Sequence, residues 1–361
     1  MTRTTEPTKG TVAPGAALSM PKSRIAPPME APALRWGVLG TGWIAAQFTA
    51  SVTAHTRQIV AAVGSRSIDG ARGFAARNGI AHAHGSYDAL VSDPGVDVIY
   101  VATPHNLHHE HVLLALNAGK HVLVEKPMAL NRAQAAEMVV LARARGLFLA
   151  EALWSCFLPK FDVIDQILAS GMLGEIRSVY TEYGEYLPPT HRLFDPALAG
   201  GPLLDLGTYP VSLIVKLMGV PDRMVGLGQV DPSGVNGQLA VVMADAAGNI
   251  GTMATTPYGF SPTNAAIVGT GGSLRFGSEF NLPGPFELRS PDGGVVLRHD
   301  EPVGRHFDGL FYEAAEVARC ISAGKTETPC RPLDATLDTI ATLDMIRATI
   351  GIDFSAAGLV E

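Results

Sequence analysis

A glycine-rich turn between a strand-like run and a helix-like run constrains the fold of this chain more than any other feature. The apolar run LRWGVLG ends at Gly40, the turn continues as GTGWIA, and the helical stretch WIAAQFTASVTAH follows directly. In the spacing G-x-G-x-x-A, Gly40 permits a tight turn, Gly42 lets a pyrophosphate approach the backbone, and Ala45 allows the helix to pack closely on the strand. The alternative is an ordinary glycine turn, but the strand–turn–helix context favours a dinucleotide site. The candidate contacts in this turn are Gly40, Thr41, Gly42, Trp43 and Ile44.

The next strand-like run, QIVAAVGSRS, bears on which dinucleotide is bound. An NAD site usually ends this strand with Asp or Glu, about 20 residues beyond the glycines, to hold the ribose hydroxyls. Here that place holds Ser65, Arg66 and Ser67. Arg66 can pair with a 2′-phosphate and Ser65 can donate a hydrogen bond to it. The sequence therefore predicts NADP(H) rather than NAD(H), with a solvated loop arginine as the alternative reading of Arg66.

Strand-like and helix-like runs continue to alternate through the first half of the chain. The runs VDVIYVATP, HVLVEKP and LFLAEALW are strand-like, and helical patterns such as NLHHEHVLLALNAG and RAQAAEMVVLARARG separate them. Repeated βαβ units predict a parallel sheet whose ligands bind beyond the carboxyl ends of the strands. The candidate residues at these ends are Thr103, Pro104, Glu125, Lys126 and Trp154.

Four histidines in the stretch HNLHHEH raise the question of a metal site. They are His105, His108, His109 and His111. Metal ligands must share a face, whereas neighbouring residues of a helix point in different directions. We therefore expect no metal here. His108, near the start of its helix, is a candidate to line the cofactor cleft.

The pattern changes from about residue 155. Strand-like runs such as EIRSVYTEYGEY and QLAVVMADAAGNIGTMATT, with hairpin turns at AAGN and DGG, predict a mostly antiparallel sheet with helices on one face. The other face also needs a cover, and a second subunit is the simplest one, so we expect a homodimer or a dimer of dimers. In the helical segment AGGPLLDLGTYPVSLIVKLMG, Asp205 and Tyr209 lie four residues apart and would share a helix face. The alternative is a structural role, in which Tyr209 is half-buried and its hydroxyl forms a hydrogen bond with Asp205.

Length and composition narrow the remaining possibilities. A chain of 361 residues suggests two domains, and we assign residues 34–154 and 155–361 to them, after a disordered leader at residues 1–33 rich in Thr, Pro, Ala and Gly. A net charge of −7 argues against nucleic acid or an anionic membrane as the partner. Three cysteines without CxxC spacing indicate a reduced, cytoplasmic protein without a zinc site. The sequence contains no apolar run of about 18 residues, so we expect no membrane span. The leader also lacks the apolar region of a signal peptide.

Five motifs occur in a recognisable order: GTGWIA, ATPHNLHHE, AGKHVLVEKP, GLFLAEALW and GGPLLDLGTYP. Over about residues 34 to 352 the chain resembles the Gfo/Idh/MocA oxidoreductase family, and in particular its branch of dimeric dihydrodiol dehydrogenase and NADP-dependent D-xylose dehydrogenase. The resemblance implies a doubly wound α/β Rossmann domain and an α+β domain with a large, mostly antiparallel open sheet. It implies that Lys126 is the catalytic lysine, that Tyr209 is the general acid or base, and that Asp205 lies beside it. Trp154 and Tyr183 match positions that line the substrate pocket.

The reaction implied by this resemblance is hydride transfer between NADP(H) and a hydroxyl-bearing carbon of a sugar or cyclic polyol, with C1 of an aldose such as D-xylose or D-glucose as the expected position. A trans-dihydrodiol dehydrogenase, a sugar–sugar oxidoreductase that keeps its NADP, and a non-catalytic NADP-sensing regulator are the alternatives. We expect Lys126 to lower the pKa of Tyr209 toward neutrality. One departure from the branch is Cys156 in WSCFLP, where an arginine is usual.

Overall fold

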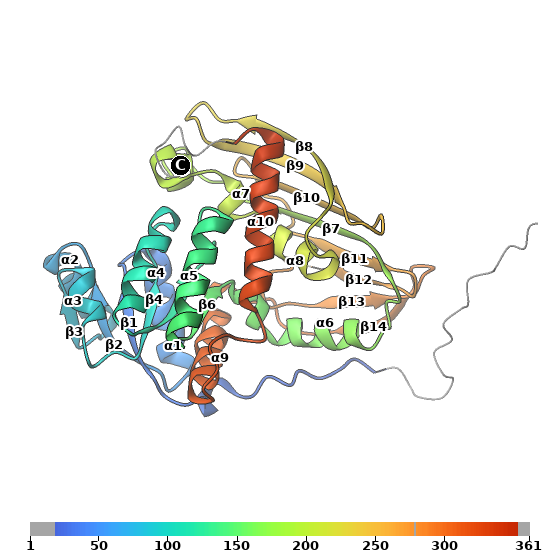
Figure 1. Ribbon diagram of the computed structural model, residues 1–361. Coiled ribbons are helices and arrows are strands. Elements are labelled where there is room, and N and C mark those ends of the chain that lie inside the picture. Colours follow the sequence, from blue (N-terminus) through green and yellow to red (C-terminus); the bar gives the residue numbers. More distant parts are fainter. Residues whose placement is uncertain (1–18, 278, 353–361) are drawn as a thin grey trace, which may run out of the picture.

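The computed structural model describes residues 19–277 and 279–352, and this part of the chain builds two sheets that stand side by side (Figure 1). The first sheet has six strands, all parallel, in the order β3-β2-β1-β4-β5-β6. Its central strands are apolar runs because both faces of a parallel sheet are buried. The strands are β1 Arg35–Leu39, β2 Ile59–Gly64, β3 His82–His84, β4 Val98–Val101, β5 His121–Glu125 and β6 Leu149–Ala152.

Helices cover both faces of this sheet, and two of them come from the far end of the chain. The helices that connect the strands are α1 Trp43–His55, α2 Ile68–Asn78, α3 Tyr87–Val91, α4 His108–Asn117 and α5 Arg132–Arg145. Side-chain caps start three of them: Ser67 accepts from the Gly70 amide, Ser86 from the Ala89 amide and Asn131 from the Gln134 amide. Helix α9 (Leu310–Ser322) packs against α1, and α10 (Leu333–Ile350) packs against α5. The C-terminal helices therefore complete the core of the N-terminal sheet.

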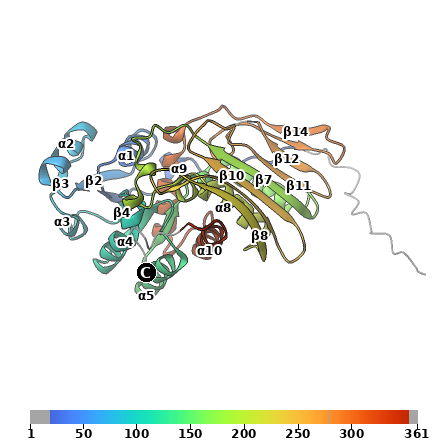
Figure 2. The ribbon, with the colours of Figure 1, turned by 90° about the horizontal axis from the view of Figure 1, so that it is seen from above.

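The second sheet has eight strands in the order β14-β13-β12-β11-β7-β10-β9-β8. Only β7 and β10 pair in parallel; the other neighbours are antiparallel. Helices α8 (Thr208–Met218) and α10 cover one face, while in the described part of the chain no helix covers the other (Figure 2). These two sheets confirm the predicted fold class. The strands are β7 Ile176–Gly184, β8 Arg223–Val230, β9 Asn236–Ala244, β10 Ile250–Thr256, β11 Ala265–Gly269, β12 Ser273–Phe276, β13 Phe286–Arg289 and β14 Val295–His299.

The segment expected to be one helix around Asp205 and Tyr209 is broken in two. Helix α7 (Pro202–Asp205) ends before Gly207, and α8 (Thr208–Met218) begins after it; α6 (Pro159–Ala169) precedes both in the chain. A Cβ on Gly207 would lie 2.5 Å from the Leu203 carbonyl oxygen, so a glycine is needed at this bend. The prediction that Asp205 and Tyr209 share the face of one helix was therefore wrong.

The prediction of a disordered leader was wrong for residues 19–33, whereas residues 1–18 lie outside the described residues. Arg24 forms an ion pair with Asp162 of α6 at 2.6 Å. Arg319 of α9 donates to the carbonyl oxygens of Ala26 and Pro27, and Ala31 is fully buried. An extended segment without apolar periodicity is thus held through its backbone and through one charged pair, neither of which leaves a hydrophobic pattern in the sequence.

Two strands went unrecognised in the sequence, β3 and β8. β8 contains two glycines and has largely exposed side chains, so its composition gives little sign of a strand. The division of the chain between residues 154 and 155 stays a prediction. Over residues 19–277 and 279–352, no single helix has the length and apolar content to cross a membrane, although the bent pair Pro196–Asp205 and Thr208–Met218 passes that test by composition.

Candidate active site

A cavity of about 580 Å³ lies beyond the carboxyl ends of the first sheet and is closed by residues of the second half of the chain. The structure brings most of the predicted site residues together around it. From the first half these are Gly42, Trp43, Ile44, Thr103, Pro104, His108, Glu125 and Lys126. From later elements they are Trp154, Tyr183, Asp205 and Tyr209.

Four predicted residues, Gly40, Thr41, Ser65 and Arg66, do not line this cavity. Gly40 has a φ of +113°, and a Cβ there would lie 2.8 Å from the Ala102 carbonyl oxygen, so its role is to shape the turn. Arg66 is exposed and follows Gly64, the strand partner of Leu39 at the end of β1. Arg66 therefore lies outside the cavity, two residues beyond the end of the strand that pairs with β1.

The start of α1 fits the pyrophosphate of a dinucleotide. Gly42 is the N-cap residue of α1, and no side chain caps this helix. A Cβ built on Gly42 would meet nothing within 4 Å, so open space adjoins the first turn. Free N–H groups and the positive end of the helix dipole at such a place bind phosphate. The residues present therefore suit a nicotinamide dinucleotide.

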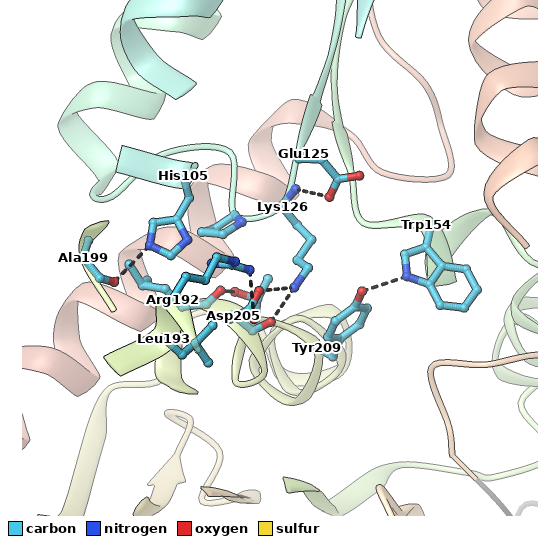
Figure 3. Close-up of polar contacts among 12 residues, drawn as sticks. His105, Glu125, Lys126, Trp154, Arg192, Leu193, Ala199, Asp205 and Tyr209 are labelled. Carbon is cyan, nitrogen blue, oxygen red and sulfur yellow. Dashed lines mark hydrogen bonds and ion pairs between the residues drawn. The ribbon is translucent and has the colours of Figure 1, made fainter. Parts of the chain in front are cut away.

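Lys126 follows directly on the buried strand β5 and lines the cavity, and the peptide bond from Lys126 to Pro127 is cis. Its Nζ donates to the main-chain oxygen and to Oδ1 of Asp205, both at 2.7 Å (Figure 3). Burial opposes ionisation of Asp205, but the charges of Lys126 and Arg192 outweigh it and hold the pKa of Asp205 well below its usual range. A partly buried ammonium–carboxylate pair thus lines the cavity.

Tyr209 presents its phenol to the same cavity. Its hydroxyl does not form the hydrogen bond with Asp205 that the sequence offered as the alternative role of this tyrosine. Trp154 Nε1, rather than Asp205, donates to Tyr209 Oη, at 2.7 Å. Lys126 Nζ lies 5.1 Å from the centre of the Tyr209 ring. The expectation that Lys126 lowers the pKa of Tyr209 was wrong: burial raises this pKa well above its usual value, and Tyr183 and Glu125 raise it further. The phenol therefore holds its proton in this structure.

The histidines of the stretch HNLHHEH form hydrogen bonds to other segments of the chain. His108 is buried, and its two ring nitrogens lie 2.8 Å from the Pro127 oxygen and 2.9 Å from the Thr103 oxygen. It therefore joins the segments that follow β4 and β5. His105 contacts the Ala199 oxygen, and burial lowers its pKa to about 4. Within the described ranges no group of three or more His, Cys, Asp or Glu side chains could hold a metal ion.

Glu125, the residue before Lys126, interacts with a second buried carboxyl group, that of Glu313. Glu125 accepts from the Tyr100 hydroxyl and from the Lys126 amide. Glu313 of α9 is fully buried, and neither of its carboxyl oxygens has a hydrogen-bond partner among the described residues. Burial raises the pKa of Glu125 to about 7. Burial and the charge of Glu125 raise the pKa of Glu313 well above its usual value, so the Glu313 carboxyl retains its proton near neutral pH.

A buried ion pair anchors the segment after Lys126. Arg331 donates through Nε and Nη2 to Glu151 Oε2, at 2.9 and 2.7 Å. The other oxygen of Glu151, Oε1, accepts from the Met128 amide at 2.9 Å. The carboxylate of Glu151 thus ties the segment that carries Lys126 to the start of α10.

Sequence reasoning missed part of the cavity wall: His105, Glu185, Leu187, Thr190, His191, Arg192, Leu206 and His306. Arg192 donates to Asp205 Oδ2 at 3.3 Å. The His306 ring contacts both Trp43 and Trp154, with ring centres 5.9 and 5.1 Å apart. His105 and Leu206 lie within two of the motifs, whereas the others lie outside the motifs and follow no periodic pattern. Cys156 does not line the cavity.

Sheet topology, glycine turn and cavity place this chain among the dinucleotide-dependent oxidoreductases. The family model described as "Oxidoreductase family, NAD-binding Rossmann fold" matches residues 34–152, and the one described as "GFO/IDH/MocA C-terminal domain" matches residues 161–275. The chain belongs to the Gfo/Idh/MocA oxidoreductase family, as its motifs indicated. It is an NAD(P)-dependent oxidoreductase of the kind that acts on CH–OH donors.

Three known proteins illustrate the similarity. The trans-1,2-dihydrobenzene-1,2-diol dehydrogenase of Bos taurus is 35% identical over 331 residues, covering 89% of this chain and 98% of the relative. KijD10, a 3-ketoreductase from Actinomadura kijaniata solved with NADP and TDP-benzene, aligns with a TM-score of 0.76 and 26% identity over 88% of this chain and 98% of its own. A levoglucosan dehydrogenase solved with NADH and levoglucosan aligns with a TM-score of 0.80 over 89% and 98% of the two chains; at 18% identity it shows the fold alone.

Proposed function

We propose that this enzyme transfers hydride between NADP(H) and a hydroxyl-bearing carbon of a sugar or cyclic diol. The observation that carries the proposal is the meeting of the Lys126–Asp205 ion pair and the Tyr209 phenol at one cavity that opens onto the glycine turn. An oxidoreductase of this kind needs a proton donor or acceptor and a fixed charge at the reacting oxygen, and these side chains supply both.

The roles of the side chains follow from their contacts. When bound, the nicotinamide supplies or accepts the hydride at C4. Tyr209 Oη accepts from Trp154, and within the described part of the chain its own proton has no protein acceptor. In the reduction direction Tyr209 donates this proton to the carbonyl oxygen and becomes a phenolate; in oxidation the Tyr209 phenolate takes the hydroxyl proton and becomes the phenol again. Lys126, held by Asp205, keeps a positive charge beside the phenol and stabilises its anion.

Two substrate classes are candidates. C1 of an aldose remains our first choice, and a trans-1,2-dihydrodiol is the second, favoured by the 35% identity to the bovine dihydrodiol dehydrogenase. Tyr183 and Trp154 supply aromatic faces that suit either ring.

A spectrophotometric screen decides between these readings. Aldoses, inositols and trans-dihydrodiols are offered with NADP⁺ and with NAD⁺, and absorbance of the reduced nicotinamide is followed. We expect turnover with one ring class. Cofactor that copurifies and needs no addition would favour a sugar–sugar oxidoreductase. A folded protein that binds NADP(H) but turns over no alcohol would favour the NADP-sensing regulator.

The choice of NADP(H) is tested at Arg66. Replacing Arg66 with alanine should raise KM for NADP⁺ about 10- to 100-fold, because a charge-assisted hydrogen bond to the 2′-phosphate is worth about 1.5–3 kcal/mol. KM for NAD⁺ should change less than about 3-fold, since a ribose hydroxyl carries no such charge. Arg72→Ala, an exposed arginine on α2, is the matched control. Equal losses for both cofactors in Arg66→Ala would contradict the assignment.

We propose that the enzyme is a homodimer, or a dimer of dimers, built through the open face of the second sheet. A hollow of about 950 Å³ on this face is lined by strands β7 to β12, and apolar side chains beside it are exposed, among them Tyr180, Val225, Leu227, Val230 and Val242. Contiguous exposed apolar surface of this kind marks an interaction site. An isologous dimer would cover it.

The substitution Leu227→Asp tests this assembly, because Leu227 is 84% exposed in the single chain. A buried, unpaired carboxylate at a two-fold interface should shift the protein to monomer in light scattering at micromolar concentration. Val140→Asp, at a position 66% exposed on α5, is the control and should leave the assembly unchanged. A Leu227→Asp protein of unaltered mass would place the interface elsewhere.

A further inference from the structure

Asp205 holds two cations, one on each carboxylate oxygen. Oδ1 accepts from Lys126 at 2.7 Å and Oδ2 accepts from Arg192 at 3.3 Å (Figure 3). Lys126 lies in the interior of the site, whereas the Arg192 side chain is 43% exposed. Arg192 belongs to the short helical turn Arg192–Phe194, in the irregular segment between β7 and α7. The second cation is therefore the one nearer to solvent.

The guanidinium of Arg192 has donors to offer a substrate. A guanidinium carries five N–H donors, and the one hydrogen bond of the Arg192 side chain among the described residues is that to Asp205. Arg192 lines the same cavity as Lys126 and Tyr209. One carboxylate holds both cations, and all three side chains line the cavity to which Tyr209 presents its phenol, so the remaining N–H groups can serve a substrate bound there.

We propose that Arg192 is a specificity-determining residue, which binds an oxygen on the carbon adjacent to the reacting one and so selects vicinal diols and their α-hydroxy carbonyl products. This inference rests on the proposed function and adds to it the pattern of oxygens that the substrate carries. Neighbouring hydroxyl groups present two oxygens side by side, as the two cations on Asp205 stand side by side. A single alcohol would leave the guanidinium donors without an acceptor.

The charges of the cavity favour a neutral substrate. Asp205 neutralises one of the two cations, and Glu185 lines the same wall. Burial raises the pKa of Glu185, and a carboxylate brought close to it would meet a second acidic group. Burial lowers the pKa of His105 and of His306 to about 4, so neither adds positive charge near neutral pH. A hydroxyl oxygen therefore fits beside Arg192 better than an acid does.

The test compares two substrates in the full-length enzyme: trans-cyclohexane-1,2-diol and cyclohexanol, each with NADP⁺. For Arg192→Leu we expect kcat/KM for the diol to fall about 10- to 100-fold, chiefly through KM, because a charged hydrogen bond is lost. For cyclohexanol the change should stay below about 3-fold. Arg192→Lys should recover part of the loss with the diol, since it restores the charge but not the planar donors. Arg57→Leu, an exposed arginine after α1, is the control.

Three results would overturn the inference. If Arg192→Leu lowers kcat equally for both substrates, Arg192 only positions Asp205 and Lys126. If it leaves activity toward the diol unchanged and lowers activity only toward a 2-hydroxy acid, offered as a third substrate, the site recognises a carboxylate instead. If the wild-type enzyme turns over neither compound, binding to the NADP⁺ complex is followed by the fluorescence of Trp43 and Trp154, which line the cavity. Equal binding of diol by wild type and Arg192→Leu overturns the role of Arg192, whereas weakened binding without turnover overturns only the proposed reaction.

Discussion

Replacing Lys126 with methionine should lower kcat/KM by at least about 10²-fold, while the protein still binds NADP(H). Methionine keeps much of the length of lysine but removes the ammonium that donates twice to Asp205 and lies over the Tyr209 ring. The phenolate of Tyr209 then loses its nearest fixed positive charge, and Asp205 keeps only the longer contact to Arg192. Both changes act on the reacting oxygen, so kcat should fall more than KM rises.

Steady-state kinetics with the best substrate of the screen measure this effect, and fluorescence titration measures NADPH binding. Tyr209→Phe should produce a similar loss, and the double variant should be little worse than either single one, because the two groups act as a unit. Lys216→Met, which removes a lysine paired with Asp165 on the surface, is the control. Near-normal turnover in either Lys126→Met or Tyr209→Phe would remove that residue from the mechanism.

Replacing Arg331 with methionine should cost about 3–5 kcal/mol of the free energy of unfolding, because it leaves Glu151 buried without its partner. Arg331 is 4% exposed and Glu151 is fully buried. Loss of the pair should also loosen the Met128 amide, which Glu151 holds, and with it the segment that carries Lys126. We therefore expect lower activity at temperatures where the variant is still folded.

Urea unfolding of the variants checks this prediction. Arg298→Met, which breaks an exposed pair with Glu287, should change stability by less than about 1 kcal/mol. The double variant Arg331→Met, Glu151→Gln should regain part of the loss, since it no longer buries an unpaired charge. A loss below about 1 kcal/mol in Arg331→Met would show that water or other groups satisfy Glu151.

The sequence predicted the part of the site that rests on regular elements. Gly42 is the N-cap of a helix that follows a buried strand, and Lys126 directly follows another buried strand, so the glycine spacing and the strand pattern place both at the carboxyl edge of a parallel sheet. Tyr209 and Asp205 were assigned through the family resemblance, and the structure places both at the cavity. The break at Gly207 was missed because an apolar run of that length reads as one helix.

The remaining wall of the cavity depends on contacts that leave no local pattern. Arg192 reaches Asp205 from an irregular segment, and His306 reaches Trp154 from a position more than 150 residues away in the chain. Neither segment has a period or a motif, so its placement comes only from tertiary packing. The pKa of Tyr209 was also misjudged from sequence, because the distance to Lys126 was assumed and the burial of the phenol was not known.

The ion pair between Lys126 and Asp205 crosses the seam between the two sheets. Lys126 follows β5 of the first sheet, whereas Asp205 ends α7, which packs on β9 and β10 of the second. Helix α10 contacts both α5 and α8 and so sets the spacing across this seam. A misplacement of about 1 Å at a reacting group can cost about 10²-fold in rate. Random mutagenesis for altered turnover should therefore yield variants along α10, remote from any contact with substrate.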